Sequence, residues 1–265
     1  MSNILETIAD HARGRVSEQK KIKPLEEVKK EAFEIVKTEG ERLTFPFEEA
    51  LKKNGISFIL ECKKASPSKG LIAEDFPYVK IAKEYEEAGA SCISVLTEPK
   101  WFMGRNEYLR EITQNVSIPC LRKDFTVDEY MIYEAKTLHA SCVLLICSIL
   151  PKETVKEYIK ICDELHMSAL VETHDEKEIA DALWAGARII GVNNRNLKDF
   201  TVDINNSVRL RSLVPEDVLF VAESGIKTHE DIEILKKGKV NGVLIGESLM
   251  RAPDKAKMLN ELLKG

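Results

Sequence analysis

The feature that most constrains the fold of this chain is a short apolar run that ends at a polar or charged residue and recurs eight times. The runs span residues 57–60, 92–96, 118–121, 142–146, 169–171, 189–192, 218–222 and 242–245. Their length and their content of β-branched residues are typical of buried parallel strands. A (β/α)8 barrel holds its chemistry at the carboxyl ends of such strands, so the polar residues that follow the runs are the first candidates for a functional site.

Helical patterns lie between the runs. They span residues 75–88, 128–138, 151–165, 175–185, 203–213 and 228–236, and 247–263 follows the last run. Residues 99–112 are less regular and predict a loop with a short helix. Strands that alternate with helices indicate an α/β protein, and eight such units favour a closed TIM barrel over an open sheet.

The first 50 residues differ from the rest, because they are rich in Lys and Glu and contain no evident strand. Helix-compatible stretches cover residues 4–15, 25–37 and 47–53. We expect residues 1–50 to form an N-terminal helical extension that caps the barrel or closes one side of its site. The length of 265 residues suits one large domain, so the prediction is a single (β/α)8 barrel over residues 1–265.

The composition argues against two classes of binding partner, nucleic acids and membranes. The 39 basic and 44 acidic residues give a formal net charge of −5, which argues against a nucleic-acid partner. No apolar stretch reaches the roughly 18 residues of a membrane span, and residues 1–6 do not resemble a signal peptide. We therefore expect no membrane partner and a cytoplasmic location, and the sequence is compatible with a monomer. The six cysteines form no Cys-x-x-Cys pair, which indicates reduced, buried thiols.

The first set of candidate site residues follows the seventh and eighth runs. It consists of Ser224 and Gly225 after one strand and of Gly246 and Glu247 after the next. Many barrels bind phosphate with these two loops, because glycine lets backbone N–H groups approach the anion. Either glycine alone would indicate only a tight turn, whereas the pair favours a phosphate site. The Glu247 N–H could still bind phosphate if its carboxylate pointed to solvent.

The second set contains ionisable groups that follow four other runs. Its members are Glu61, Lys63, Lys123, Glu172, Arg195 and the neighbouring Asn193. In a closed barrel these strand ends meet at one mouth, where they can supply a general acid, a general base and fixed charge. Any one of them alone could be a solvated charge or a salt-bridge partner. His174 lies just past Glu172 and could approach the mouth, but we expect it to be a loop histidine. Neither an HExxH nor a GxGxxG motif is present, so no metal and no nucleotide cofactor is expected.

Six sequence blocks resemble those of the indole-3-glycerol-phosphate synthase family, a family of (β/α)8 lyases. The most specific is ILECKKASPSKG at residues 59–70, and the others are LRKDF at 121–125, VETH at 171–174, GVNNRNL at 191–197, AESGI at 222–226 and IGESLM at 245–250. The match is collinear over nearly the whole chain. The N-terminal helical extension also fits the family, which uses it to cover the active site.

The resemblance implies a carboxy-lyase of tryptophan biosynthesis that needs no cofactor. Its substrate would be a small phosphorylated molecule, 1-(2-carboxyphenylamino)-1-deoxyribulose 5-phosphate, which is closed to indole-3-glycerol phosphate with loss of CO2 and water. Lys123 matches the general acid, and Glu172 matches the carboxylate that assists deprotonation or stabilises the cationic ring intermediate. Glu61 and Lys63 match catalytic residues at the first strand.

The resemblance also implies a binding role for a second group of residues. Asn193 and Arg195 match groups that orient the sugar hydroxyls and the anthranilate carboxylate. Further matches to substrate-binding residues are Ser66, Pro67, Ser68 and Glu223, and the matches to the phosphate site are Ser224, Gly225, Gly246 and Glu247.

Two departures and two rival functions remain. Residues 103–106 read MGRN where members of the family often have Gly-Ser, and Glu247 stands where some members have Ser or Thr. Another phosphosugar-processing barrel, such as an isomerase, would explain the glycines but not the first-strand block. A non-catalytic barrel that binds a phosphorylated ligand would not explain the intact set of Lys63, Lys123 and Glu172.

Overall fold

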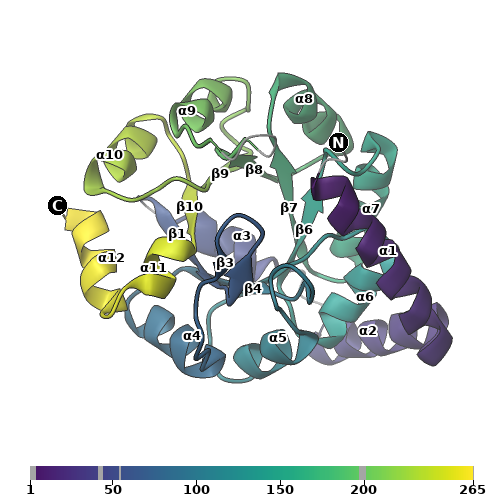
Figure 1. The fold of residues 1–265 in the computed structure, drawn as a ribbon. Coiled ribbons are helices and arrows are strands. Elements are labelled where there is room, and N and C mark those ends of the chain that lie inside the picture. The colour runs from purple at the N-terminus through teal and green to yellow at the C-terminus, as the bar shows by residue number, and fades with distance from the viewer. Residues whose placement is uncertain (1–3, 41–43, 54, 197–200, 265) are drawn as a thin grey trace.

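A computed structural model of the chain describes residues 4–40, 44–53, 55–196 and 201–264. Leu197, the last residue of the GVNNRNL block at 191–197, therefore lies outside the described residues. Eight parallel strands close into a barrel in the order β1-β10-β9-β8-β7-β6-β5-β4 (Figure 1). The strands are β1 (Ser57–Cys62), β4 (Cys92–Leu96), β5 (Cys120–Lys123), β6 (Cys142–Ile146), β7 (Ser168–Thr173), β8 (Ile189–Asn193), β9 (Leu219–Glu223) and β10 (Gly242–Ile245). The predicted (β/α)8 barrel is therefore confirmed.

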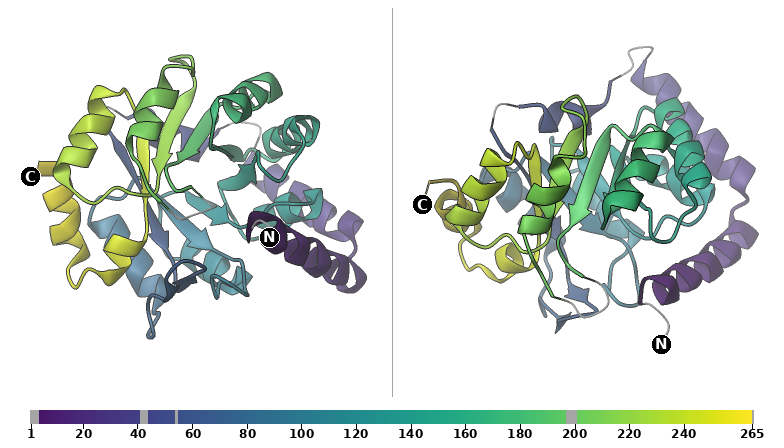
Figure 2. Two further views of the ribbon diagram at one scale, coloured as in Figure 1. Left: turned by 45° about the horizontal axis from the view of Figure 1, so that its top comes forward. Right: turned by 90° about the horizontal axis from the view of Figure 1, so that it is seen from above.

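Helices surround the barrel on its outside, as both views in Figure 2 show. They are α4 (Tyr78–Glu87), α5 (Asn106–Thr113), α6 (Glu129–Thr137), α7 (Lys152–Glu164), α8 (Glu176–Ala185), α9 (Asn205–Arg211), α10 (His229–Lys237), α11 (Glu247–Arg251) and α12 (Lys255–Lys264). Several begin where the sequence supplies a capping side chain, because Asp128, Asp175 and Thr228 each accept a hydrogen bond from a backbone N–H in the first turn.

The single helix predicted over residues 247–263 is wrong. Two helices occupy this segment, and Ala252 between them is extended, with φ −69° and ψ 128°. Pro253 follows directly, and a proline disfavours the helical conformation of the residue before it. The break turns α12 back along the outside of the barrel beside α10 and α4.

The strands run farther than the apolar runs that predicted them. Glu61, Lys123, Glu172, Asn193 and Glu223 still belong to their strands, and they take part in the last rungs of the sheet. Asn193 pairs with Glu223 in register, for example. Sheet hydrogen bonds therefore fix the backbone of these residues, and their polar side chains project from strands and not from loops.

The N-terminal helices lie against both ends and one side of the barrel. They are α1 (Ile4–Ile22), α2 (Leu25–Glu39) and α3 (Pro46–Leu51). In Figure 1, α1 runs along the edge of the barrel beside α6 and α7, and α2 packs against α6. The third helix covers the amino ends of the strands, where the Ser57 hydroxyl donates to the Ala50 carbonyl at 2.9 Å. The extension was predicted to cap the barrel or to close one side of the site. It does both, because α3 caps the amino ends of the strands and α1 closes one side of the cavity.

All six cysteines are free thiols, and five of them are buried, as predicted. None of the helices in the described ranges is long and apolar enough to cross a membrane.

Candidate active site

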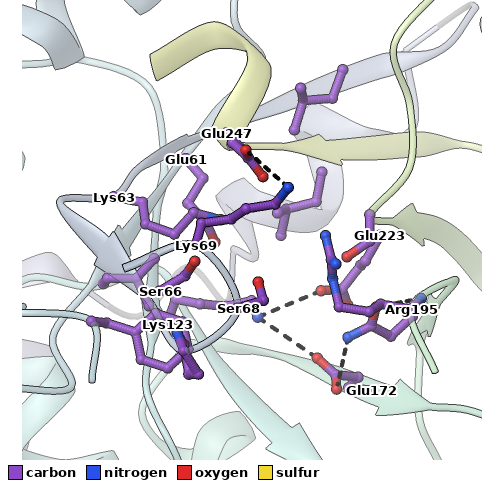
Figure 3. A pocket seen from close by; sticks show the side chains of 18 of the residues that line it. Glu61, Lys63, Ser66, Ser68, Lys69, Lys123, Glu172, Arg195, Glu223 and Glu247 are labelled. Carbon is purple, nitrogen blue, oxygen red and sulfur yellow. Dashed lines mark hydrogen bonds and ion pairs between the residues drawn. The ribbon is translucent and has the colours of Figure 1, made fainter. Parts of the chain in front are cut away.

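A cavity of about 490 Å³ opens at the carboxyl ends of the strands. Its volume lies in the range of sites that bind small organic ligands. Every site residue predicted from the sequence lines this one cavity: Glu61, Lys63, Ser66, Pro67, Ser68, Lys123, Glu172, Asn193, Arg195, Glu223, Ser224, Gly225, Gly246 and Glu247. Figure 3 shows the charged members pointing toward one another from different strands. The fold thus brings both predicted sets together.

Lys123 lies at the centre of the charged group. Its Nζ is 3.6 Å from Glu172 Oε2 and 3.6 Å from Glu223 Oε2 (Figure 3). Burial alone would lower the pKa of Lys123, but the attraction of Glu223, Glu172 and Glu61 outweighs it and raises the pKa. The side chain is therefore an ammonium ion at neutral pH, with a proton to donate into the cavity.

Glu61 and Lys63 form a second ion pair beside it. The Lys63 Nζ lies 2.6 Å from Glu61 Oε1, and the Ser94 hydroxyl donates to Glu61 Oε2 at 3.4 Å. Burial would raise the pKa of Glu61, but Lys63 and Lys123 together lower it. A Cβ at Gly246 would lie 2.5 Å from Glu61 Oε1 and 2.9 Å from Lys63 Nζ. Glycine at 246 therefore makes room for this pair as well as for a ligand.

Glu172 is buried and faces three partners. Besides Lys123, the Asn193 Nδ2 donates to its Oε1 at 3.4 Å, and the His174 Nε2 lies 3.4 Å from the same oxygen. His174 lies in a loop, as expected, and its ring also contacts a residue of the cluster. It follows β7 directly, and because side chains alternate along an extended chain, it shares the face of Glu172. That two-residue spacing was the signal available in the sequence.

Glu223 is the least satisfied member of the cluster. It is 2% exposed, and its Oε1 has no hydrogen-bond partner among the residues that the structure describes. Burial raises its pKa to about 7; Lys123 opposes the rise, and the negative charges of Glu172 and Glu61 add to it. A carboxyl group with this pKa exchanges its proton near neutral pH, which is typical of acid–base sites.

The predicted phosphate loop after β9 has an unusual backbone. Ser224 and Gly225 have φ values of +67° and +89°, and a left-handed conformation is uncommon for serine. Asn194 stabilises it, because its Nδ2 donates to the Ser224 carbonyl at 3.1 Å while its Oδ1 accepts from the Ser207 hydroxyl at 2.7 Å. Asn194 was not among the predicted site residues, since its role depends on a contact between loops far apart in the chain.

The carboxylate of Glu247 does not simply point to solvent. Its Oε1 lies 3.8 Å from Lys69 Nζ and 3.5 Å from Arg251 Nε. Lys69 lies between the two strands of a small hairpin, β2 (Ala65–Ser66) and β3 (Gly70–Leu71), that the sequence did not predict. Figure 3 shows the Lys69 side chain reaching across the cavity toward Glu247. Lys69 therefore adds a cation to this end of the cavity.

The opposite side of the cavity is apolar. Leu144 and Ile146 of β6, Phe125 after β5 and Phe102 line it. Ile4, Leu5 and Ile8 of α1 complete this wall. One end of the cavity can therefore receive an anion and the other an aromatic ring.

The first helix is held to this wall by a buried ion pair. The Arg15 guanidinium donates to Asp124 Oδ1 at 2.8 Å, and the Thr97 hydroxyl donates to Oδ2 at 2.7 Å. Burial would raise the pKa of Asp124, but Arg15 and Arg122 hold it below its usual range. Asp124 directly follows Lys123, so α1 is coupled to the strand that carries the central lysine.

No group of three or more His, Cys, Asp or Glu residues within residues 4–40, 44–53, 55–196 and 201–264 is arranged to hold a metal ion. The groups that can act on a ligand are the lysines and glutamates at the mouth. Together with the closed parallel barrel, they define a (β/α)8-barrel enzyme with an acid–base site.

Comparison with known proteins identifies the family. The family model described as Indole-3-glycerol phosphate synthase matches residues 5–262, and the chain belongs to this family. The indole-3-glycerol phosphate synthase of Ruminiclostridium cellulolyticum is 57% identical over 243 residues, which cover 90% of this chain and 94% of that protein. The corresponding protein of Lachnoclostridium phytofermentans is 53% identical and covers 98% of each chain. The family and the carboxy-lyase activity predicted from the sequence blocks are thus confirmed.

Solved structures with lower identity share only the fold. A 3-hexulose-6-phosphate synthase superposes with a TM-score of 0.63 at 15% identity, over 78% of this chain and 98% of that one. Thiamine phosphate pyrophosphorylase from Pyrococcus furiosus gives a TM-score of 0.59 at 18% identity, over 79% and 94%. These likenesses support the barrel and say nothing about the reaction.

Proposed function

We propose that the cavity closes 1-(2-carboxyphenylamino)-1-deoxyribulose 5-phosphate to indole-3-glycerol phosphate, with Lys123 as the general acid. The observation that carries this assignment is the position of the Lys123 ammonium, between two buried carboxylates and facing the cavity. A proton donor fixed on a strand keeps its geometry during the reaction, and a misplacement of about 1 Å can cost on the order of 100-fold in rate.

In the first step the ring carbon that bears the carboxylate attacks the ketone carbon. The ketone oxygen gains negative charge and takes a proton from Lys123 Nζ. Glu172 and Glu223 keep Lys123 charged before this step, as the raised pKa of the lysine indicates. The carboxylate of the substrate then leaves as CO2, and the aromatic ring is restored.

The last step removes water from the new five-membered ring. Glu61 and Lys63, held 2.6 Å apart, are the residues proposed for this dehydration. The carboxylate of Glu172 either assists the loss of the proton next to nitrogen or stabilises the cationic ring. A paired carboxylate and ammonium can act as base and acid on opposite sides of one bond.

Binding would use the two ends of the cavity. We assign the phosphate to the backbone N–H groups near Ser224, Gly225, Gly246 and Glu247, with Lys69 adding positive charge. The anthranilate ring would lie against Phe125 and the apolar face of α1. Asn193 and Arg195 would orient the sugar hydroxyls and the carboxylate, and Ser66, Pro67 and Ser68 in the β2–β3 hairpin would cover the ligand.

The test is an assay of the purified protein with this sugar phosphate, followed by the fluorescence of the indole product. Turnover supports the assignment. Absence of a signal at saturating substrate rejects it, and in that case turnover of a phosphosugar would support an isomerase, while ligand binding without turnover would support a non-catalytic barrel.

We also propose that the chain folds as one domain, acts as a monomer and works in the cytoplasm. One cooperative unfolding transition, the monomer mass in light scattering and recovery in the cytosolic fraction are the expected results.

A further inference from the structure

A chain of side chains leads from the surface of the protein to Lys123. Ser148, in the loop between β6 and α7, is exposed, and its hydroxyl lies 3.1 Å from His174 Nδ1. The His174 Nε2 lies 3.4 Å from Glu172 Oε1, and Glu172 Oε2 lies 3.6 Å from Lys123 Nζ. Glu178 of α8 fixes the ring, because its Oε2 lies 3.0 Å from Nδ1 and its Oε1 accepts from Ser148 at 2.7 Å.

The reaction needs such a path, because it consumes a proton. The ketone oxygen departs as water and takes two protons with it. One is balanced by the proton lost from the carbon next to nitrogen when the double bond forms. The second must come from solvent, because the substrate carboxylate leaves as neutral CO2. Each turnover therefore draws one proton into the cavity.

We propose that His174, positioned by Glu178 and Ser148, relays this proton from solvent through Glu172 to Lys123. This inference rests on the proposed function. After Lys123 has protonated the ketone oxygen, its amine is neutral. The His174 Nε2 gives its proton to Glu172 Oε1, and a half-turn of the carboxyl group presents that proton to the amine. The neutral ring keeps its Nδ1 proton, and a brief rotation of the ring exposes the bare Nε2 to water at Ser148, where it takes up a new proton. The ring then turns back, so the ammonium of Lys123 and the charge of His174 are both restored and the charges balance.

The electrostatics of His174 suit this role. It faces Glu172 of β7, Glu178 of α8 and the more distant Glu223 of β9, and Ser148 is its neutral partner. Burial alone would lower the pKa of His174, but the hydrogen bond to Glu178 and the attraction of Glu172 raise it. Both of its nitrogens face a carboxylate, Nε2 that of Glu172 and Nδ1 that of Glu178, and this geometry favours the protonated ring. The 3.4 Å gap to Glu172 is of the kind that shortens in a ligand complex.

The experiment compares the steady-state kcat of the wild-type enzyme, His174→Gln and His174→Gly, because the relay recharges Lys123 between turnovers. Wild-type turnover is established first, so that failure of the proposed function is separate from failure of the relay. We expect His174→Gln to lower kcat by about tenfold or more, with KM changed less than about twofold. Added imidazole should restore much of the rate of His174→Gly, which a purely structural role would not allow.

The matched controls are His139→Gln, at an exposed histidine outside the network, and Glu178→Gln. His139→Gln should keep the wild-type rate and ignore imidazole. Glu178→Gln should shift the alkaline limb of the pH profile to lower pH, because His174 must be protonated to act and loses the carboxylate that raises its pKa. A normal rate in His174→Gln overturns the relay. The relay is also overturned if the rate is lowered but imidazole does not restore it in His174→Gly and added buffer does not restore it in His174→Gln. If His174→Gly does not fold, the buffer response of His174→Gln decides alone.

Discussion

A buried glutamate lies at each end of the barrel, and the two differ in their hydrogen-bond partners. At the amino ends of the strands, Glu48 of α3 is paired with a hydroxyl and a guanidinium group. Its Oε1 accepts from the Ser168 hydroxyl at 3.2 Å and from Arg188 Nε at 3.0 Å. At the carboxyl ends, Glu223 is equally buried, but its Oε1 has no hydrogen-bond partner among the described residues and its pKa is raised to about 7, chiefly by burial.

The difference separates stability from chemistry within one fold. A buried carboxylate with matched donors stabilises the folded state, whereas one crowded by like charges costs stability and retains reactivity. Barrels concentrate stabilising residues at the amino ends of the strands and catalytic residues at the carboxyl ends. The four substitutions below test that division.

The largest effect is expected from Lys123→Ala at the mouth. Without the ammonium, the ketone oxygen has no donor in place, so kcat should fall by about 100-fold or more, the range typical of a general acid. Substrate affinity should survive, because the phosphate and ring contacts lie elsewhere. Steady-state kinetics with a binding measurement tests this. Unchanged turnover would show that the acid is another residue.

Glu223→Gln should separate activity from stability. The pKa of Glu223 is raised in the folded state, so its contribution to stability is fully present below the unfolded pKa of about 4.5 and is lost as the pH rises through about 7. Glutamine at position 223 does not titrate, so the variant does not lose stability in this pH range. Its free energy of unfolding relative to wild type should therefore rise between these pH values, by up to about 3 kcal/mol, while kcat falls. A difference that stays constant with pH would contradict the assignment.

Glu48→Ala should show the reverse behaviour at the other end of the barrel. It removes charged hydrogen bonds to Ser168 and Arg188, and we expect the free energy of unfolding to fall by about 2 kcal/mol. The half-exposed Arg188 can regain water, which limits the loss. Thermal and urea unfolding measure it. The kcat of the folded fraction should stay at the wild-type value, and a fall in kcat would mean that the two ends are coupled.

The smallest effect is expected from Lys69→Ala. Its ion pair with Glu247 is solvent-accessible and contributes little to stability, but the lysine faces the proposed phosphate end. We predict a KM raised by about threefold, less than 1 kcal/mol, with kcat unchanged. Lys177→Ala on α8 is the matched control, because Lys177 forms a similar exposed pair with Asp181. Equal KM values in the two variants would remove Lys69 from the site.

The sequence predicted the barrel because each buried strand is a continuous apolar run, and a polar residue at its end marks the mouth. That logic located Glu61, Lys123 and Glu172 without coordinates, whereas Glu223 was assigned to the site only by the family resemblance. The logic depends only on local order along the chain and on the convergence of parallel strands.

What the sequence did not predict depends on contacts between distant segments or on weak local signals. Asn194 acts on Ser224 across a gap of 30 residues, and Lys69 meets Glu247 only when the first and last strands of the barrel close. The strands of the β2–β3 hairpin have two residues each, too short for any periodicity. Pro253 did signal the helix break, but the amphipathic pattern on both sides of it concealed the signal.

A crystal structure with indole-3-glycerol phosphate bound would decide where the reaction takes place. We expect the phosphate on the loops of Ser224–Gly225 and Gly246, the indole ring against Phe125 and α1, and Lys123 facing the ring carbon that carried the ketone oxygen. A product bound in the reverse direction, or outside the cavity that Lys123, Glu172 and Glu223 share, would contradict it.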